Sequence, residues 1–222
     1  MGRSLDLFHF LHVAAFALVI AVDLPSFYAV RRAAAPRAPA GAMLLAAQLT
    51  RWTTAISGTA LTLMLPLGVE LGADMGAWRL SSPVWLTITW AVALAWLVLI
   101  VVAGRNKALY TAEIWVRVIM GLGNVYDGAI AFDGQHAIAT DWLAVKVLLF
   151  GVALLASAWV RAKMRPVRAA LSEIDPLSAQ RSTLDERTAG ELADQLRRIR
   201  PGVHAIWLAA LIAAWMGINK PF

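Results

Sequence analysis

The chain contains no cysteine and little charge. Without cysteine there are no disulfides, thiolate metal sites or cysteine nucleophiles. Charged residues make up 15% of the 222 residues, against about 25% in ordinary soluble domains. Hydrophobic residues make up 60%, and the mean hydropathy is +0.66. This composition predicts a protein that crosses a lipid bilayer several times.

Acidic residues are the scarcer charged class, 14 against 20 Lys and Arg, which gives a formal net charge of +6. Such a balance occurs in nucleic-acid-binding proteins, but here the basic residues lie mainly in connections between apolar segments, where membrane orientation explains them. We therefore expect no nucleic-acid partner. The sequence also lacks a Walker-type loop, a GxSxG elbow and an HExxH motif, so it shows no common soluble-enzyme signature.

Six segments are long and apolar enough to span a bilayer, which takes about 20 residues. The segment 84–103 is uncharged throughout, whereas 112–132 carries Arg117 and Asp127. We expect an all-α, polytopic membrane bundle of six transmembrane helices that forms a single integral membrane domain over residues 1–222. The six segments are 5–30, 43–71, 84–103, 112–132, 141–160 and 203–219.

Basic residues are concentrated in alternate connections. Several occur in 31–42, in 104–111 and at the start of 161–202, whereas 72–82 has only Arg79 and 133–140 has none. Since short cytoplasmic loops are enriched in Lys and Arg, this pattern predicts both termini on the periplasmic side of a bacterial inner membrane.

The cytoplasmic segment 161–202 contains a further helical pattern. Ser182 or Thr183 precedes an acidic residue by three positions, as at a helix start, and Leu192, Leu196 and Ile199 recur at helical spacing. We expect an amphipathic surface helix here, which Pro201 and Gly202 separate from the last span.

Two ionisable residues of the first apolar segment share one face. His12 and Asp23 are eleven residues apart, so in a helix they point within about 20° of each other and differ in depth by about 16 Å. Ionisable groups at membrane depth are costly and are hypotheses about function by default. They therefore predict two polar layers, one in each half of the bilayer.

The segment 112–132 carries a similar stripe. Glu113, Arg117, Met120, Asn124 and Asp127 follow spacings of four, three, four and three, which place them along one helix face. We expect this stripe to face the bundle and Glu113 to pair with Arg117 one turn away.

The remaining charges suggest pairs between helices. Asp23 with Arg51 is the simplest pair in the inner half, and Asp127 with Lys146 the simplest in the outer half. His12 is then available as a ligand or proton carrier. The candidate catalytic residues are Lys146 and Asp127, and the candidate cofactor-binding residues are His12, Arg51 and Asp23. Structural ion pairing is the alternative role for these charges.

Three stretches resemble one superfamily, which joins HemJ-type membrane protoporphyrinogen oxidases with CopD-like copper-resistance proteins. They are FLHVAAFALVIAVDLPSFYAVRR, WLAVKVLLFGVALL, and the tail from RIRPGVHAIW to INKPF. Leu11 with His12, Trp142 with Lys146, and Lys220 with Pro221 match the HemJ-type pattern. A later family histidine is Ser157 here, and two spans look additional. The resemblance implies a shared helical scaffold with His12 and Lys146 as site residues.

Three functions follow as hypotheses. The first is a haem- or porphyrin-associated redox protein, in which His12 ligates the iron of haem b and Lys146 or arginine residues contact the propionates. The second is CopD-like copper transport or resistance, with His9 and His12 as metal ligands, joined by a methionine or His136. The third is a non-catalytic membrane subunit or scaffold. A homo-oligomer or a membrane redox partner is compatible with these hypotheses.

Overall fold

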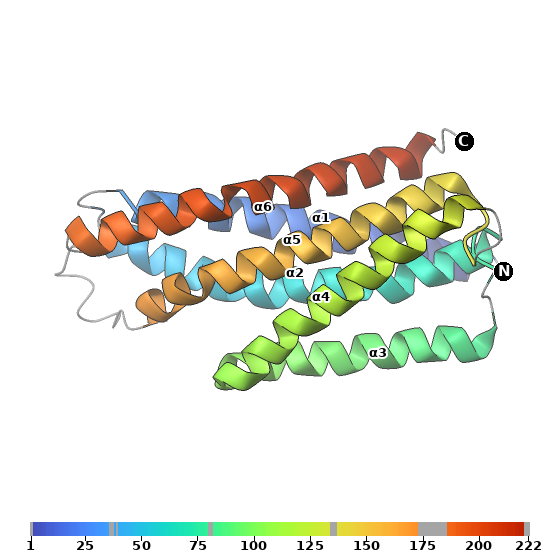
Figure 1. Cartoon of the computed structure of the whole chain (residues 1–222), viewed down its shortest axis with the longest axis horizontal. Helices are drawn as coiled ribbons and strands as arrows, with labels where there is room; N and C mark the ends of the chain where they lie inside the picture. Colours follow the sequence, from blue (N-terminus) through green and yellow to red (C-terminus); the bar gives the residue numbers. More distant parts are fainter. Residues whose placement is uncertain are drawn as a thin grey trace.

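The computed structural model describes residues 2–35, 38, 40–79, 82–133, 137–172 and 186–219. The described chain folds into long helices that run back and forth along one axis (Figure 1). The 3₁₀ turns η1 (Ala103–Arg105) and η2 (Ala131–Asp133) follow the third and fourth helices. The six long helices are α1 (Gly2–Ala33), α2 (Ala40–Asp74), α3 (Pro83–Val102), α4 (Lys107–Ile130), α5 (Asp141–Ser172) and α6 (Glu186–Asn219).

Five of these helices contain a stretch long and apolar enough to cross a membrane: Leu7–Ala33, Gln48–Asp74, Pro83–Val102, Asp141–Pro166 and Ala193–Asn219. Helix α4 has 24 residues, but the charged residues along it lower its hydropathy. The predicted all-helical fold is confirmed, and its apolar helices are those expected of a multi-pass membrane protein. A sixth crossing by α4 and the orientation of the termini stay predictions.

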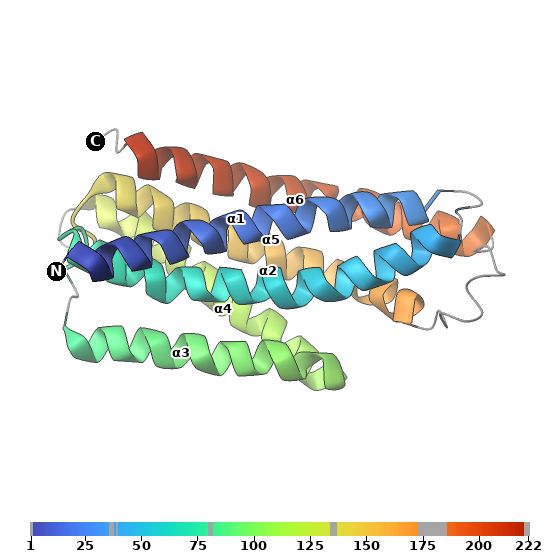
Figure 2. The ribbon, with the colours of Figure 1, turned by 180° about the vertical axis from the view of Figure 1, so that it is seen from behind.

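The bundle has a dense part and a peripheral helix. Helix α1 packs along α2, and α5 packs against both α4 and α6. Helix α3 contacts α2 and α4 and otherwise lies apart from the bundle, as both views show (Figures 1 and 2). Helix α1 begins, and α6 ends, at the same end of the bundle. This arrangement gives α3 a wide exposed apolar surface, which suits contact with lipid.

The two ends of the bundle differ in composition. At the end where α1 leads into α2, exposed side chains include Arg31, Arg32, Lys163 and Arg165. We call this the basic end. At the other end, which we call the far end, the backbones of Trp78 and Ile138 form an isolated antiparallel bridge that joins two connections.

Local sequence signals set where two helices start. Pro83 occupies the first turn of α3, where its missing N–H removes no helical hydrogen bond. Asn106 caps α4, since its side-chain oxygen accepts hydrogen bonds from the backbone N–H of Ala108 at 2.6 Å and of Leu109 at 3.1 Å. Such capping directs α4 back along the bundle.

Glycines allow α4 and α5 to approach closely. A Cβ built on Gly128 would lie 2.7 Å from the Ala144 carbonyl oxygen and 2.7 Å from the Leu148 nitrogen. One built on Gly121 would lie 2.8 Å from Leu155 Cγ. Gly121 is thus a close-packing position, whereas a Cβ on Gly123 would meet nothing within 4 Å.

Helices α5 and α6 continue beyond their apolar parts. Residues 161–172 extend α5, and α6 runs without a break through Pro201. The predicted break at Pro201 and Gly202 is therefore wrong. The reason is packing: Gly202 fits against Trp159, and Ile199 and Val203 are buried on either side. This burial offsets the roughly 3 kcal/mol that an internal proline costs. Ser182 and Thr183 lie outside the described residues.

Candidate functional site

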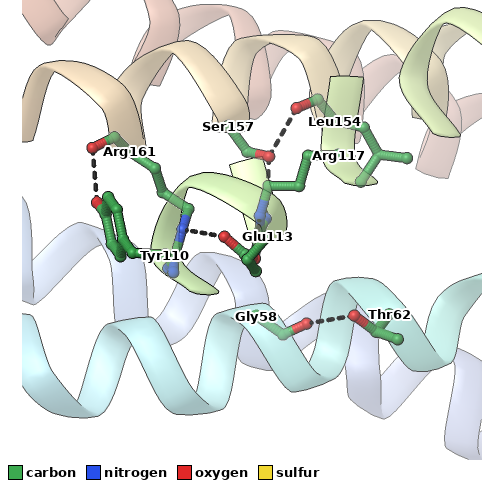
Figure 3. A network of polar contacts seen from close by, with 8 residues as sticks. All are labelled: Gly58, Thr62, Tyr110, Glu113, Arg117, Leu154, Ser157 and Arg161. Carbon is green, nitrogen blue, oxygen red and sulfur yellow. Dashed lines mark hydrogen bonds and ion pairs between the residues drawn. The ribbon is translucent and has the colours of Figure 1, made fainter. Parts of the chain in front are cut away.

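A fully buried ion pair stands at the centre of the candidate site. The side chains of Arg117 and Glu113 are 2% and 0% exposed, and Arg117 Nε donates to Glu113 Oε1 at 2.6 Å (Figure 3). The predicted intrahelical pair is confirmed. Arg117 Nη1 also donates to Ser157 Oγ on α5 at 3.0 Å, and the Arg117 guanidinium lies 5.7 Å from the Trp96 ring centroid on α3. These contacts offset the several kcal/mol that each ion loses on desolvation.

A second guanidinium shares the same carboxylate. Arg161 Nε on α5 lies 2.7 Å from Glu113 Oε2, as an ion pair rather than an aligned hydrogen bond. The Tyr110 hydroxyl donates to the Arg161 carbonyl oxygen at 2.7 Å, and its ring centroid lies 5.0 Å from the Arg161 guanidinium. Glu113 therefore connects α4 to α5 through its contact with Arg161, whereas its contact with Arg117 lies within α4 (Figure 3).

Small residues on α2 leave room for this cluster. A Cβ built on Gly58 would lie 3.3 Å from Arg117 Nη2, which is tighter than an ordinary contact. Thr62, one turn along, is fully buried and donates its hydroxyl proton to the Gly58 carbonyl oxygen at 2.9 Å. The guanidinium of Arg117 thus reaches the surface of α2 because residue 58 has no side chain.

Asp23 brings a second carboxyl group to the cluster from α1. Its side chain forms a hydrogen bond with Ser57 and interacts electrostatically with Arg117. The expected partner, Arg51, lies on α2, but its side chain is outside the described part of the chain. The described partners of Asp23 are therefore Ser57 and Arg117.

These groups surround a cavity of about 130 Å³. Along α1 it extends from Asp23 to Val30, a rise of about 10 Å toward the basic end. Phe27, Leu61 and Val203 contribute apolar wall, so the cavity has both a charged and a hydrocarbon surface. Its polar and charged lining residues come from four helices and are Asp23, Ser26, Thr50, Thr53, Ser57, Tyr110, Arg117, Ser157 and Arg161.

An apolar layer separates this cavity from the far end. Its buried core and the side chains packed against it come from α1, α2 and α5. Leu61 belongs both to this layer and to the cavity wall. We define the apolar layer as Ala15, Val19, Ala60, Leu61, Met64 and Phe150.

The second predicted polar layer lies beyond the apolar layer. His12 is half-buried and packs on α2, where a Cβ on Gly68 would lie 3.5 Å from His12 Cε1. Lys146 Nζ lies 5.7 Å from the Trp142 ring centroid, and a Cβ on Gly217 of α6 would be 3.0 Å from it. His12 and Lys146 are close enough to interact electrostatically. The structure thus brings these two predicted site residues together.

Other predicted residues are less enclosed. Asp127 and His9 are exposed, and His136 lies outside the described residues. The predicted polar stripe on α4 is buried at Glu113 and Arg117 and becomes exposed at Asp127. Its outer part turns away because Gly121 and Gly128 occupy the contact with α5.

Sequence reasoning missed Arg161, Ser57 and Ser157 as site residues. Arg161 belongs to a predicted basic connection, whereas in the structure α5 continues beyond it to Ser172. The available signal was the occurrence of serines within apolar segments, since a buried hydroxyl needs a hydrogen-bond partner. Their partners on other helices are not visible in the sequence.

Comparisons with known proteins identify no relative of this chain, so its function is inferred from the residues of the site. No family model matches the chain, and neither a curated protein nor a solved structure matches it.

Proposed function

We propose that this chain is an integral membrane protein that binds a small carboxylate anion in the cavity lined by Asp23, Arg117 and Arg161, which we call the basic-end cavity. The observation that carries the proposal is the presence of Arg117 and Arg161 in the wall of one cavity inside a helix bundle. A guanidinium presents paired N–H donors that match a carboxylate, and its attraction is stronger away from water.

The size and the wall of the cavity favour a short-chain acid. Its volume of about 130 Å³ is close to the roughly 150 Å³ of an engineered cavity that accepts benzene. Phe27, Leu61 and Val203 supply an apolar surface for a few carbon atoms. A four-carbon carboxylate such as butyrate combines both requirements, and serves as the probe.

The test compares butyrate with butyramide, which has nearly the same shape and no charge. Butyrate should raise the unfolding temperature of the detergent-purified protein in a dose-dependent manner, as any ligand selective for the folded state does, and butyramide should not. The background salt is a large organic sulfonate at constant ionic strength.

Variants connect this binding to the cavity. Arg117→Lys keeps the positive charge but removes the fork of donors, so it should weaken butyrate binding at least tenfold. Arg198→Lys is the matched control, because Arg198 also pairs with an acid one turn away, Asp194 at 2.9 Å, but on an exposed surface. Equal protection by butyrate and butyramide, or no protection, would contradict the proposal.

Haem association is a second proposal, and it rests on the resemblance and on His12. His12 Nδ1 is buried and makes no hydrogen bond to a described residue. The basic-end cavity does not fit a porphyrin, because the macrocycle is several times larger than benzene and His12 does not line that cavity. A Soret absorbance band in the purified protein, lost in His12→Ala, would support haem b; a preparation that stays colourless after haem addition would oppose it.

Copper binding has weaker support. Among the described residues no group of three or more His, Asp or Glu could hold a metal ion. Copper transport, a homo-oligomer and a membrane redox partner stay predictions from the sequence.

A further inference from the structure

The described charged groups around the cavity balance one another when all are ionised. Arg117 and Arg161 carry two positive charges, and Glu113 and Asp23 carry two negative charges. Glu113 contacts both guanidinium groups and is not part of the cavity wall. Asp23 does line the cavity, so a bound anion would meet a second negative charge there.

Adding one carboxylate to this balanced set leaves one uncompensated negative charge inside the bundle. Such a charge is expensive in a medium of low dielectric constant. A proton that enters with the anion removes this cost. The question is then which group accepts the proton.

The contacts of each group single out Asp23. Each oxygen of Glu113 already contacts a guanidinium group, that of Arg117 or that of Arg161. Tyr110 donates its hydroxyl proton to the Arg161 carbonyl oxygen, and arginine stays protonated in proteins. Asp23 lines the cavity, forms its hydrogen bond with the neutral hydroxyl of Ser57, and interacts with Arg117 electrostatically.

No other described lining residue competes for this proton. Helix α6 contributes Ile199, Val203 and Ile206 to the wall, none of which titrates. On α2 the described lining residues are neutral, and the side chain of Arg51 lies outside the described part of the chain.

We infer that the cavity binds a carboxylate and a proton together, the carboxylate at Arg117 and Arg161 and the proton on Asp23. The equilibrium is site plus RCOO⁻ plus H⁺ giving a complex in which Asp23 is protonated, with no covalent step. The bound anion and proton together have the composition of the neutral acid, and the site keeps its charge balance. The inference rests on the proposed function for the identity of the ligand. It adds that a proton binds together with this ligand.

The direct test is the proton count of butyrate binding. Titration calorimetry of the full-length protein, in two buffers of different ionisation enthalpy, should show uptake of close to one proton per butyrate. By linkage, affinity should then fall about tenfold per pH unit. Asp23→Asn should bind butyrate with no proton uptake and with affinity independent of pH.

Matched variants separate coupling from damage to the fold. Asp194→Asn changes an exposed aspartate in the basic-end part of α6 and should keep the proton count of the wild type. Where Asp23→Asn does not fold, Ser57→Ala replaces it: this variant retains the carboxyl, loses its hydroxyl partner, and should shift the midpoint of the pH profile of binding.

The possible results are distinct. Butyrate binding without proton uptake, or uptake unchanged in Asp23→Asn, overturns the coupling and leaves the proposed function in place. With Ser57→Ala, an unchanged pH profile has the same meaning. If butyrate does not bind at all, both the proposed function and the coupling fail.

Discussion

Glu113 is the shared counterion of two guanidinium groups while fully buried. Its two oxygens contact Arg117 at 2.6 Å and Arg161 at 2.7 Å, so removing its charge would leave two cations that no longer share a counterion. Loss of one partner of a buried ion pair costs more than the pair contributes, because the other charge remains desolvated. The main effect of removing Glu113 is therefore to leave Arg117 and Arg161 desolvated without their shared counterion.

We predict that Glu113→Gln lowers the free energy of unfolding by about 3–5 kcal/mol. Chemical unfolding in detergent, followed by tryptophan fluorescence, measures this change. Asp194→Asn removes the carboxylate of the exposed pair with Arg198 and should cost no more than about 1 kcal/mol. Similar losses in both variants would mean that burial does not set the strength of the Glu113 contacts.

For individual residues, the sequence predicts contacts within a helix better than contacts between helices. The spacing of Glu113 and Arg117 was sufficient to predict their pair. The contact of Arg161 with Glu113 depends on how α5 lies against α4, which no spacing within one helix reveals. The same reason explains why Ser57 was missed as the partner of Asp23.

Helices α4 and α5 pack closely because glycines occupy their contact. The two helices meet through Gly121, Gly128 and Gly151, where backbone atoms of the partner occupy the space of a side chain. Such contacts stabilise helix pairs in a membrane through van der Waals packing, since lipid provides no hydrophobic driving force between them.

We predict that Gly128→Ala destabilises the protein by about 1–3 kcal/mol through overpacking. Gly123→Ala provides the comparison on the same helix, because a Cβ at residue 123 meets nothing within 4 Å. That variant should be neutral or stabilising by up to about 1 kcal/mol, since alanine favours helix over glycine. Thermal unfolding of both variants measures the difference, and a Gly128→Ala protein as stable as Gly123→Ala would refute the close contact.

Helix boundaries show what hydropathy can and cannot predict. The segments 84–103 and 141–160 agree well with the apolar parts of α3 and α5, because a lipid-facing span requires an uninterrupted apolar run. Hydropathy does not report where a helix continues into more polar surroundings, as α5 does to Ser172 and α6 does from Glu186. Those extensions are held by contacts such as Gly202 on Trp159.

Across the whole molecule, polar and apolar levels alternate along the bundle axis. The basic-end cavity comes first, the apolar layer follows, and His12 with Lys146 lies beyond it. A hydrocarbon level of this kind opposes the entry of water and ions. The two polar layers were predictable from His12 and Asp23, whereas the cavity depends on side chains from five helices.

The alternation predicts access to the cavity from one side of the membrane. Because the chain has no cysteine, each introduced cysteine is unique. In proteoliposomes, Ser26→Cys in the cavity wall should react with a small, charged methanethiosulfonate at least tenfold faster from the basic end than from the far end. The rate of reaction from each side is measured by protection of a later fluorescent label.

Cysteines at two exposed positions serve as markers for the two sides of the membrane. Ala35→Cys marks the basic end, and Met75→Cys, near the far end of α2, marks the other. Reaction of Ser26→Cys from both sides at similar rates would show that the apolar layer does not close the cavity, and labelling of both markers from one side would refute the spanning of α2.

The charge on α4 also bears on how the protein is made. At the centre of a membrane helix an arginine costs about 2.5–3.5 kcal/mol in insertion experiments. Arg117 is compensated in part by Ser157, and Glu113 in part by Arg161, and both partners are translated only later, as part of α5. If α4 crosses the membrane as predicted from the sequence, we therefore expect it to enter the lipid together with α5 rather than alone.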